Sequence, residues 1–349
     1  MPVNGVSVSL LVQLVLHEIF AAVNSMKIVR DRLFVLSIFT VQSLLCAATP
    51  AHATNRIIAW GDIDYNLIIG SPRPREGVVA QIAAGDFHSL ALRSDGTVTA
   101  WGDNRFGQTS VPDKVRRGIA VEITAGNVHS LALMRDGTVV AWGPSDGQYG
   151  DYGQCNVPKG LKKVVSIAAG AVHSLALKRD GTVVAWGANE TGQCNVPPGL
   201  DNVVAVAGGM YHSLALKNDG TVVAWGDNEW GQTTVPDGLN NVVAIGAAGF
   251  HSLALKNDGT VVSWGTYGLA QVSVPPGLTH VVAIATGDYH GLALKSDGTL
   301  VTWGFDSNGQ CDVPPTLTNV VAIASRGGHS MVLVNDGPPW PFHSRKFPK

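Results

Sequence analysis

A repeat of about 40 residues runs through the sequence from residue 57 to residue 337 and limits the folds open to it. The dipeptide Trp-Gly recurs at intervals of 41, 41, 44, 39, 39 and 39 residues, with its tryptophans at Trp60, Trp101, Trp142, Trp186, Trp225, Trp264 and Trp303. A histidine recurs with nearly the same spacing, at His88, His129, His173, His212, His251, His290 and His329. Such a period is typical of proteins built by stacking one supersecondary unit.

Each repeat has the pattern of β structure. An apolar run of the VVAI type is followed by HSLALKN (residues 212–218), in which large and small residues alternate. The next Asp-Gly pair supplies the positive φ angles of a tight hairpin, and TVVAWG (221–226) is rich in β-branched residues. We expect GQTTVP (231–236) to form a short fourth strand at the edge, where proline is tolerated. Four antiparallel strands per repeat predict one blade of a β-propeller.

The two ends of the repeat region are complementary halves of one unit. The first Trp-Gly, in residues 57–62, has no His-Ser-Leu phrase before it, and the last such phrase, in residues 329–337, has no Trp-Gly after it. We therefore predict an all-β fold over residues 54–337, a seven-bladed β-propeller closed by pairing of N- and C-terminal strands in one blade. That blade is expected to combine residues 320–335 with 57–70, which leaves no open sheet edge.

The repeated tryptophans and histidines are predicted to be structural. A buried tryptophan covers roughly 150–250 Å² and would cement the contact between neighbouring blades. The histidines share one strand position, and we expect one ring nitrogen of each to bond to a backbone carbonyl. Imidazoles on separate blades lie too far apart for bonds of about 2.0–2.1 Å to a single ion, so no metal and no cofactor is predicted.

The first 53 residues have the three parts of a secretory signal peptide. Met26–Arg32 is basic, Leu33–Ala48 is mostly apolar, and Ala51–Ala53 (AHA) is a small-x-small cleavage site. We expect residues 1–53 to be this signal, with Met26 as the true start, and the mature protein to be secreted or periplasmic.

The alternative for the N-terminus is a membrane anchor. Val6–Val23 is also apolar, although it contains His17 and Glu18, and a run of about 18 apolar residues can span a bilayer. At the other end, residues 338–349 are basic and proline-rich and are predicted to be a flexible tail.

Charge and cysteine content exclude some functions. The net charge is −2, whereas a surface built for nucleic acid usually has a strong basic excess. Three cysteines lie in the same GQC phrase of different repeats, at Cys155, Cys194 and Cys311. An odd number cannot pair completely within the chain, so they are expected to be small buried thiols.

The stretch HSLALKNDGTVVAWGDNEWGQTTVP (212–236) resembles the bacterial form of the regulator-of-chromosome-condensation repeat. The resemblance extends over residues 57–337 and implies a seven-bladed propeller closed by strands from both termini. The founding member of the family is a nuclear exchange factor for a small GTPase. This chain instead has a predicted signal peptide, no basic nucleosome-binding tail and no long wedge-like insertion in a blade, so exchange activity is not expected.

The repeats are most similar to those of the secreted propeller-type β-lactamase inhibitory proteins, which share the phrases HSLALK, VxAWGxN and GQTTVP. This resemblance implies that aromatic side chains in loops at one end of the propeller bind an enzyme. Val128, Val172 and Gly328 interrupt the aromatic series here, so the β-lactamase target is not carried over.

Strand direction places the residues before each repeated histidine, and those after each Trp-Gly, at the same rim. The predicted partner-binding residues at this rim are Phe87, Phe106, Tyr211, Trp230, Phe250, Tyr267 and Tyr289. An insertion at residues 144–156 adds Tyr149 and Tyr152, and the opposite rim carries NDG and PPGL phrases without aromatics. Aromatics gathered on a charge-poor protein indicate a binding surface, although several of these rings could instead pack into the blade tops.

These observations favour a secreted protein-interaction propeller, in the manner of an inhibitor of an extracellular enzyme. Its partner is expected to be a secreted or periplasmic enzyme, with no nucleic acid, no membrane contact beyond the signal peptide, and a monomeric state. No catalytic residue is predicted, because the acidic residues recur in turn phrases. The alternative is a carbohydrate-binding or enzymatic propeller that uses its central funnel. In that case Asp86 and Asp288 could bind a sugar or a basic group. A third function, that of a nucleotide exchange factor, is less favoured.

Overall fold

A computed structural model describes residues 55–62, 78–145, 147, 150–266 and 273–335. The predicted signal segment, the predicted tail and Tyr267 lie outside the described residues. Within the described part of the chain, no helix is long and apolar enough to cross a membrane.

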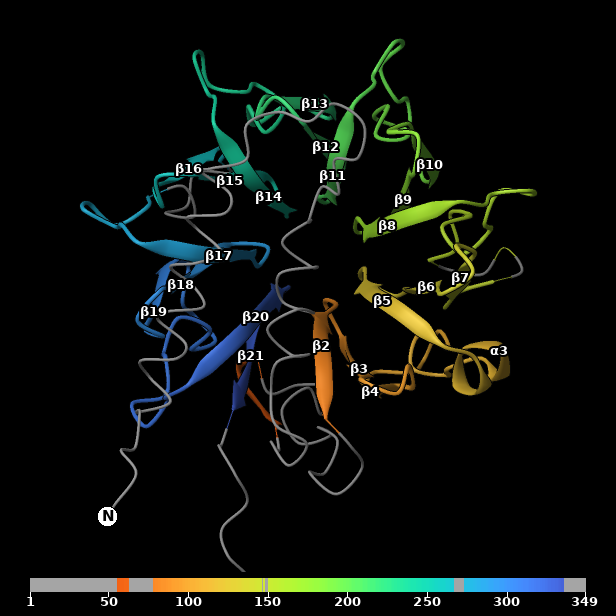
Figure 1. The fold of residues 1–349 in the computed structure, drawn as a ribbon, viewed down its shortest axis with the longest axis horizontal. Coiled ribbons are helices and arrows are strands. Elements are labelled where there is room, and N and C mark those ends of the chain that lie inside the picture. The colour runs from red at the N-terminus through yellow and green to blue at the C-terminus, as the bar shows by residue number, and fades with distance from the viewer. Residues whose placement is uncertain (1–54, 63–77, 146, 148–149, 267–272, 336–349) are drawn as a thin grey trace, which may run out of the picture. The chain divides into compact units, whose positions relative to one another are not determined.

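The described residues fold into seven antiparallel sheets of three strands each, arranged around a common centre (Figure 1). The first strand of each sheet lies nearest the centre (Figure 1). In chain order the blades are β2 (Val79–Ala84), β3 (His88–Arg93) and β4 (Val98–Gly102); β5 (Ala120–Ala125), β6 (Ser130–Met134) and β7 (Val139–Trp142), preceded by α3 (Asp113–Arg117); β8 (Val164–Ala169), β9 (His173–Lys178) and β10 (Val183–Gly187); β11 (Val203–Gly208), β12 (His212–Lys217) and β13 (Val222–Gly226); β14 (Val242–Ala248), β15 (His251–Lys256) and β16 (Val261–Trp264); β17 (Val281–Thr286), β18 (His290–Lys295) and β19 (Leu300–Gly304); β20 (Val320–Arg326), β21 (His329–Asn335) and β1 (Asn55–Gly61).

The seventh blade joins the two ends of the repeat region. Strand β1 pairs with β21 in antiparallel register from Asn55 opposite Asn335 to Gly61 opposite His329. Strand β21 pairs on its other side with β20, so the last blade takes its third strand from the start of the chain. The predicted seven-bladed propeller and its mode of closure are therefore confirmed.

The predicted fourth strand of each blade is wrong for the described repeats. In the fourth blade, residues 231–236 form no strand; residues 231–233 form a bend and a turn, and Gly231 has a φ of 76°. Asn228 accepts a hydrogen bond from the Thr233 amide at 3.0 Å, and Gln232 accepts one from the Trp230 amide at 2.9 Å. These side chains satisfy the backbone donors locally, which replaces the ladder that a strand would need.

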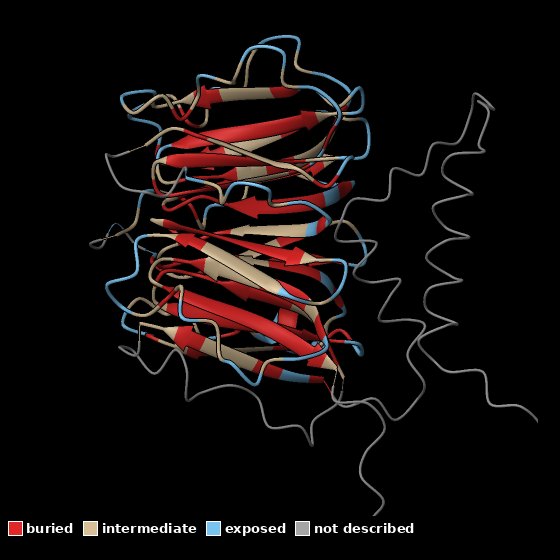
Figure 2. Ribbon diagram, turned by 90° about the vertical axis from the view of Figure 1, so that its left-hand side faces the viewer, coloured by how far each residue is buried: buried red, intermediate tan, exposed pale blue. Residues whose placement is uncertain are grey.

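The tryptophans pack between neighbouring blades. Each repeated tryptophan is only 6–7% exposed. Trp186 of the third blade lies in one cluster with Leu131 and Leu133 of the second, and its indole nitrogen donates to the Gln154 carbonyl at 2.9 Å. Buried residues run along the strands, and exposed ones gather in the loops (Figure 2). Each tryptophan thus adds both apolar contact and one directional bond to a blade interface.

Replacement of Trp186 by alanine is expected to lower the free energy of unfolding by about 3–5 kcal/mol, because it leaves a cavity between two blades and removes one of the two hydrogen bonds that the Gln154 carbonyl accepts. Urea denaturation followed by circular dichroism measures the loss. Tyr152→Ala, which removes a ring that is 49% exposed, is the matched control and should cost little. A similar small loss for both variants would contradict the interfacial role of Trp186.

The histidines form a second belt of contacts between blades. All seven are fully buried, at 0% exposure. Six of them bond through Nε2 to a serine hydroxyl of the next blade; His88 meets Ser130 at 2.8 Å, and His329 meets Ser89 at 3.2 Å to complete the circle. Ser130 in turn donates to the Gln108 carbonyl at 2.8 Å, so the imidazole must be the donor in the first bond. The expected partner of the ring nitrogen, a backbone carbonyl, is thus replaced by a serine.

One link of this belt differs. Gly291 stands where the other blades have serine, so His251 lacks the equivalent hydroxyl. The indole of Trp303 fills the space that a Cβ at residue 291 would occupy. A bulkier residue at 291 would therefore require this buried ring to move.

Candidate functional site

Two series of loop positions lie at the same end of the sheets. One is the residue before each repeated histidine, between the first and second strands of a blade. The other lies in the loop after each third strand. We use the name aromatic rim for the described aromatic residues at these positions: Phe87, Phe106, Tyr152, Tyr211, Trp230, Phe250, Tyr289 and Phe305.

The repeat holds the backbone of the first series. The Tyr211 carbonyl accepts a hydrogen bond from the Asp227 amide at 2.9 Å, and the Tyr289 carbonyl accepts one from the Phe305 amide at 2.9 Å. The equivalent bond joins Phe87 to the Asp103 amide at 2.8 Å. Main-chain bonds of this kind fix the loop whatever the side chain is, so the side chain can vary from blade to blade.

The second series is held by a glutamine. Gln108, Gln154 and Gln232 each accept a hydrogen bond from the amide two residues earlier, at 2.9, 2.7 and 2.9 Å. Those amides belong to three aromatic residues, Phe106, Tyr152 and Trp230. The glutamines are buried, at 0% exposure, and their main-chain carbonyls receive the indole and serine bonds of the next blade. The aromatic positions are therefore anchored directly to the blade interfaces.

The aromatic side chains meet in two pairs on the later blades. The ring centroids of Tyr211 and Phe250 lie 6.4 Å apart, and those of Tyr289 and Phe305 lie 6.3 Å apart in an edge arrangement. Tyr211 is 37% exposed and Phe305 is 40% exposed. The other predicted rim residues that the structure describes are half-buried: Phe87, Phe106, Trp230, Phe250 and Tyr289. Each of these rings therefore packs with part of its surface against the blade and leaves the rest exposed to solvent.

One member of the aromatic rim, Phe305, was missed by the sequence analysis. Phe305 directly follows a Trp-Gly pair, at a position occupied by Asp103 and Asp227 in other blades. Tyr152, which the sequence analysis placed at this rim, precedes its glutamine by two residues, as Phe106 and Trp230 do.

The centre of this rim is filled by a charged cluster. Arg326 of the seventh blade donates from Nε to Asp86 at 3.0 Å and from Nη1 to the Ala169 carbonyl at 3.0 Å and the Gly208 carbonyl at 3.4 Å. It thereby connects four blades across the ring. Asp288 accepts a bond from the Gly249 amide at 3.2 Å and belongs to the same cluster. All three charged residues are only 5–8% exposed, so at this rim the predicted central funnel is occupied by the protein itself.

The two carboxyl groups of the cluster retain a proton more readily than usual. Burial raises the pKa of Asp86 to about 8; the neighbouring Asp288 adds to this increase, and Arg326 opposes it. Burial also raises the pKa of Asp288. One shared proton leaves a single negative charge opposite the guanidinium, which is a neutral arrangement suited to the interior. The partner available to Asp86 and Asp288 is therefore Arg326 rather than a sugar or a basic ligand.

Three free cysteines lie in the described part of the chain, and they are half-buried rather than buried as expected. Burial raises the thiol pKa of Cys155 to about 12 and those of Cys194 and Cys311 to about 11, so these free thiols remain protonated. Among the described residues, no group of three His, Cys, Asp or Glu side chains is placed to hold a metal ion.

A family model described as the regulator of chromosome condensation (RCC1) repeat matches five segments, at residues 79–108, 120–154, 164–193, 203–232 and 281–310. These segments coincide with five of the seven structural repeats. No curated protein sequence matches the chain.

Solved structures share the fold at low sequence identity. Prp20p of Saccharomyces cerevisiae, described with its binding to Gsp1p and histones, is 22% identical with a TM-score of 0.67, over 82% of this chain and 92% of that one. Yeast RCC1 (Prp20) bound to Kap60 is 21% identical with a TM-score of 0.70, over 91% and 96%. Human WBSCR16 is 20% identical with a TM-score of 0.64, over 80% and 99%. At these identities the likeness establishes the propeller fold alone.

Proposed function

We propose that this chain, whose repeats match the RCC1 repeat, is a secreted protein-interaction propeller that binds a partner protein through the aromatic rim and acts as an inhibitor of an extracellular enzyme. The observation that carries this proposal is the pairing of half-exposed rings on blades four to six. Tyr211 with Phe250 and Tyr289 with Phe305 present aromatic surface on backbone positions that the repeat holds in place.

The aromatic rim is preorganised for binding. Aromatic side chains supply large contact areas at low cost in side-chain entropy, which is why they dominate binding hot spots. Fixed loops further reduce the entropy lost on association. One structural relative, Prp20p, is described with protein partners in two separate structures, which supports protein binding as the use of such a propeller. Secretion rests on the predicted signal peptide in residues 1–53.

The proposal is tested by affinity capture from culture supernatant with the chain from Thr54 onward. A second bait carries Tyr211→Ala, Phe250→Ala and Tyr289→Ala. A control bait carries Asn218→Ala and Asn257→Ala, at hairpin positions on the opposite rim of the same blades. We expect a partner on the first and third baits, with at least a ten-fold loss on the second because each hot-spot ring contributes about 1–2 kcal/mol or more.

Circular dichroism and thermal unfolding must first show that the triple variant is folded. A partner held equally by the triple variant would contradict the role of the aromatic rim. A ligand that proves to be a glycan would instead favour the carbohydrate-binding alternative.

A further inference from the structure

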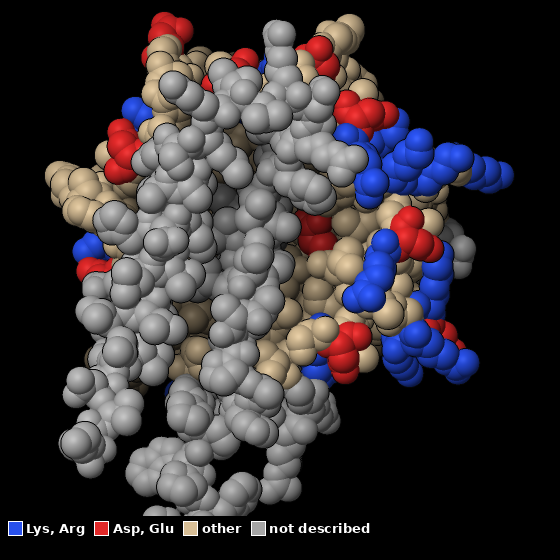
Figure 3. All heavy atoms as spheres, in the orientation of Figure 1, with Lys and Arg blue, Asp and Glu red and all other residues tan. Residues whose placement is uncertain are grey.

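Lysine and arginine side chains gather at the rim opposite the aromatic rim, over the second and third blades. Figure 3 shows them on one side of the face, over α3, β5 and β8. We use the name basic face for these exposed residues: Lys114, Arg116, Arg117, Arg135, Lys159, Lys162, Lys163 and Arg179. The whole chain has a net charge of −2, so this is a local feature and not a consequence of composition.

Two arginines of the basic face depart from the repeat at the same hairpin position. Arg135 and Arg179 lie in the turns between the second and third strands of their blades. The other five blades carry uncharged residues there: Ser94, Asn218, Asn257, Ser296 and Asn335. The hairpin backbone is alike in these blades, since the amide of Arg179 donates to Lys163 at 2.9 Å and that of Asn218 donates to Asn202 at 2.9 Å. The fold therefore does not require arginine at this position.

Lys163 departs from the repeat at a conformational cost. Its φ is 59°, in the left-handed region. Asparagine occupies the equivalent position at Asn202, Asn241 and Asn319, and histidine does so at His280. Asparagine tolerates this region far better than lysine does, and such strain at a single position points to a role beyond folding.

The nearby acidic groups neutralise only part of this charge. Asp113 pairs with Arg117 at 3.3 Å, and Asp180 pairs with Lys178 at 2.9 Å. Asp136 accepts bonds from the amide and hydroxyl of Thr138 in its own turn. These contacts leave the cations around the boundary between the two blades directed to solvent.

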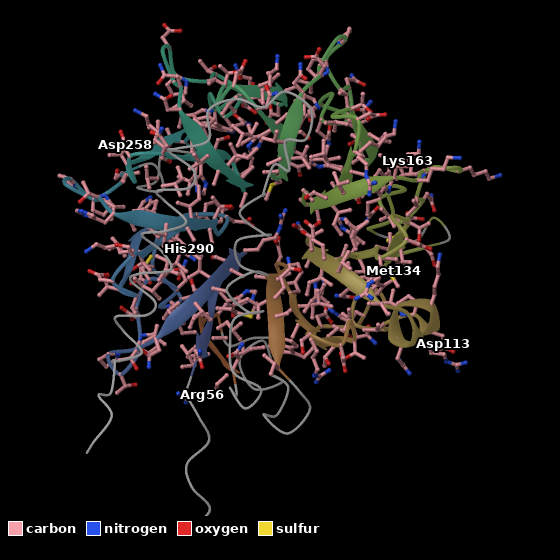
Figure 4. The ribbon with its side chains drawn as sticks, in the orientation of Figure 1. Arg56, Asp113, Met134, Lys163, Asp258 and His290 are labelled. Atoms are coloured by element: carbon pink, nitrogen blue, oxygen red, sulfur yellow. The ribbon has the colours of Figure 1, made fainter. Side chains whose placement is uncertain are left out.

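A hollow of about 540 Å³ lies between these cations. Its walls include Arg135, Lys163 and Arg179, with Asp136 as the one acidic residue of the lining. Its apolar lining includes Val121 and Val165, which are 45% and 42% exposed. In Figure 4, Met134 and Lys163 mark the two sides of this boundary, with Asp113 of α3 beyond Met134. An apolar floor with a cationic border fits an extended segment that has carboxylates flanking an aliphatic side chain.

The same geometry disfavours two other anions. The lining of the hollow includes no aromatic residue on which a nucleic-acid base could stack. A phosphate headgroup would use the cations but would leave the valines exposed. An acidic peptide uses both parts of the site.

We propose that the basic face is a second docking site, which binds an acidic peptide segment with an aliphatic residue seated between blades two and three. This site is independent of the aromatic rim. Binding at both rims would allow the propeller to hold two partners, or two parts of one partner, at once.

The test uses the full chain and a fluorescein-labelled peptide of sequence Glu-Asp-Glu-Leu-Glu-Asp-Glu, with anisotropy measured at low salt and at about 0.15 M salt. The variant carries Arg135→Asn, Lys163→Asn and Arg179→Asn, which places a residue typical of the repeat at each position. The matched control carries Lys217→Gln, Lys256→Gln and Lys295→Gln, which removes the same charge from hairpins of blades four to six.

We expect the peptide to bind the parent and the control with similar affinity and the asparagine variant at least about ten-fold more weakly. Replacing the leucine of the peptide by serine should also weaken binding. The asparagine variant should melt no lower than the parent, because the change Lys163→Asn puts a residue that tolerates a positive φ at that position. Equal weakening by the control, no binding at low salt, or tighter binding of an oligonucleotide or of phosphatidylserine vesicles would overturn the proposal.

Discussion

Deletion of residues 55–61 is expected to abolish cooperative unfolding of the propeller. These residues form β1, the third strand of the seventh blade. Their loss exposes the edge of β21 and removes Trp60, whose indole donates to the Gln310 carbonyl at 3.0 Å. It also removes Ile57, which packs with Val79 and Trp101 of the first blade. The ring would then be open between its last blade and its first.

Chemical denaturation measures this effect. The parent should unfold in one steep transition, whereas the shortened chain should show a broad, low-amplitude transition because its unfolding exposes less surface. Deletion of residues 338–349, the predicted tail, is the control at the other terminus. A shortened chain with the midpoint and slope of the parent would refute closure of the ring by β1.

Acid unfolding is the second large effect, and it should begin below pH 6.5. Burial lowers the pKa of His88, His173, His212 and His290 to about 3. It lowers those of His251 and His329 to about 4, and that of His129 well below its usual value. Each of these side chains has a lower pKa in the folded protein than in the unfolded protein. Such a group contributes fully to stability at a pH above its pKa in the unfolded protein, and this contribution is lost as the pH falls toward its pKa in the folded protein.

Buried carboxyl groups act in the opposite direction. The pKa values of Asp86 and Glu122 are raised to about 8, and that of Asp288 is also raised, in each case chiefly by burial. These groups gain a proton on folding, so their contribution is complete below pH 4 and decreases as pH rises toward 8. The seven histidines outnumber the two protons that these carboxyl groups hold, one on Glu122 and one shared by Asp86 and Asp288, so unfolding takes up about five protons net near pH 5, or roughly 7 kcal/mol per pH unit.

A stability of about 5–15 kcal/mol would therefore be exhausted within two or three pH units below 6.5. Urea midpoints measured from pH 8 to pH 4 give the proton uptake from their slope. The variant His173→Gln keeps a donor for Ser213 without the titrating ring, and its slope should be smaller by about one proton. Stability independent of pH between 6.5 and 4.5 would contradict the account of the histidine belt.

The sequence was sufficient to predict the blades and their closure, because the period and the complementary halves at residues 57–62 and 329–337 leave few other arrangements. It did not predict that residues 231–236 would form no fourth strand. Hydrogen bonds that Asn228 and Gln232 accept from nearby amides compete with strand formation there. The pattern of apolar residues alone does not reveal this competition.

The site could be predicted only where strand direction determines it. Direction alone places Phe87 and Tyr211 at one rim. The Asp86–Arg326 contact joins residues 240 apart in sequence, and the contacts of Arg326 with blades three and four depend on the diameter of the ring. The serine partners of the histidines likewise depend on how far one blade rotates from the next. Such distances across a ring are not encoded in a repeat pattern.

The central claim is that the aromatic rim is the partner-binding surface, and hydrogen–deuterium exchange of the propeller with and without its captured partner tests it most directly. We predict slower exchange in the loops around Tyr211, Phe250 and Tyr289, and unchanged exchange in the hairpins at residues 217–221 and 256–260 of the opposite rim. Protection confined to those hairpins, with the three aromatic loops unchanged, would contradict the claim.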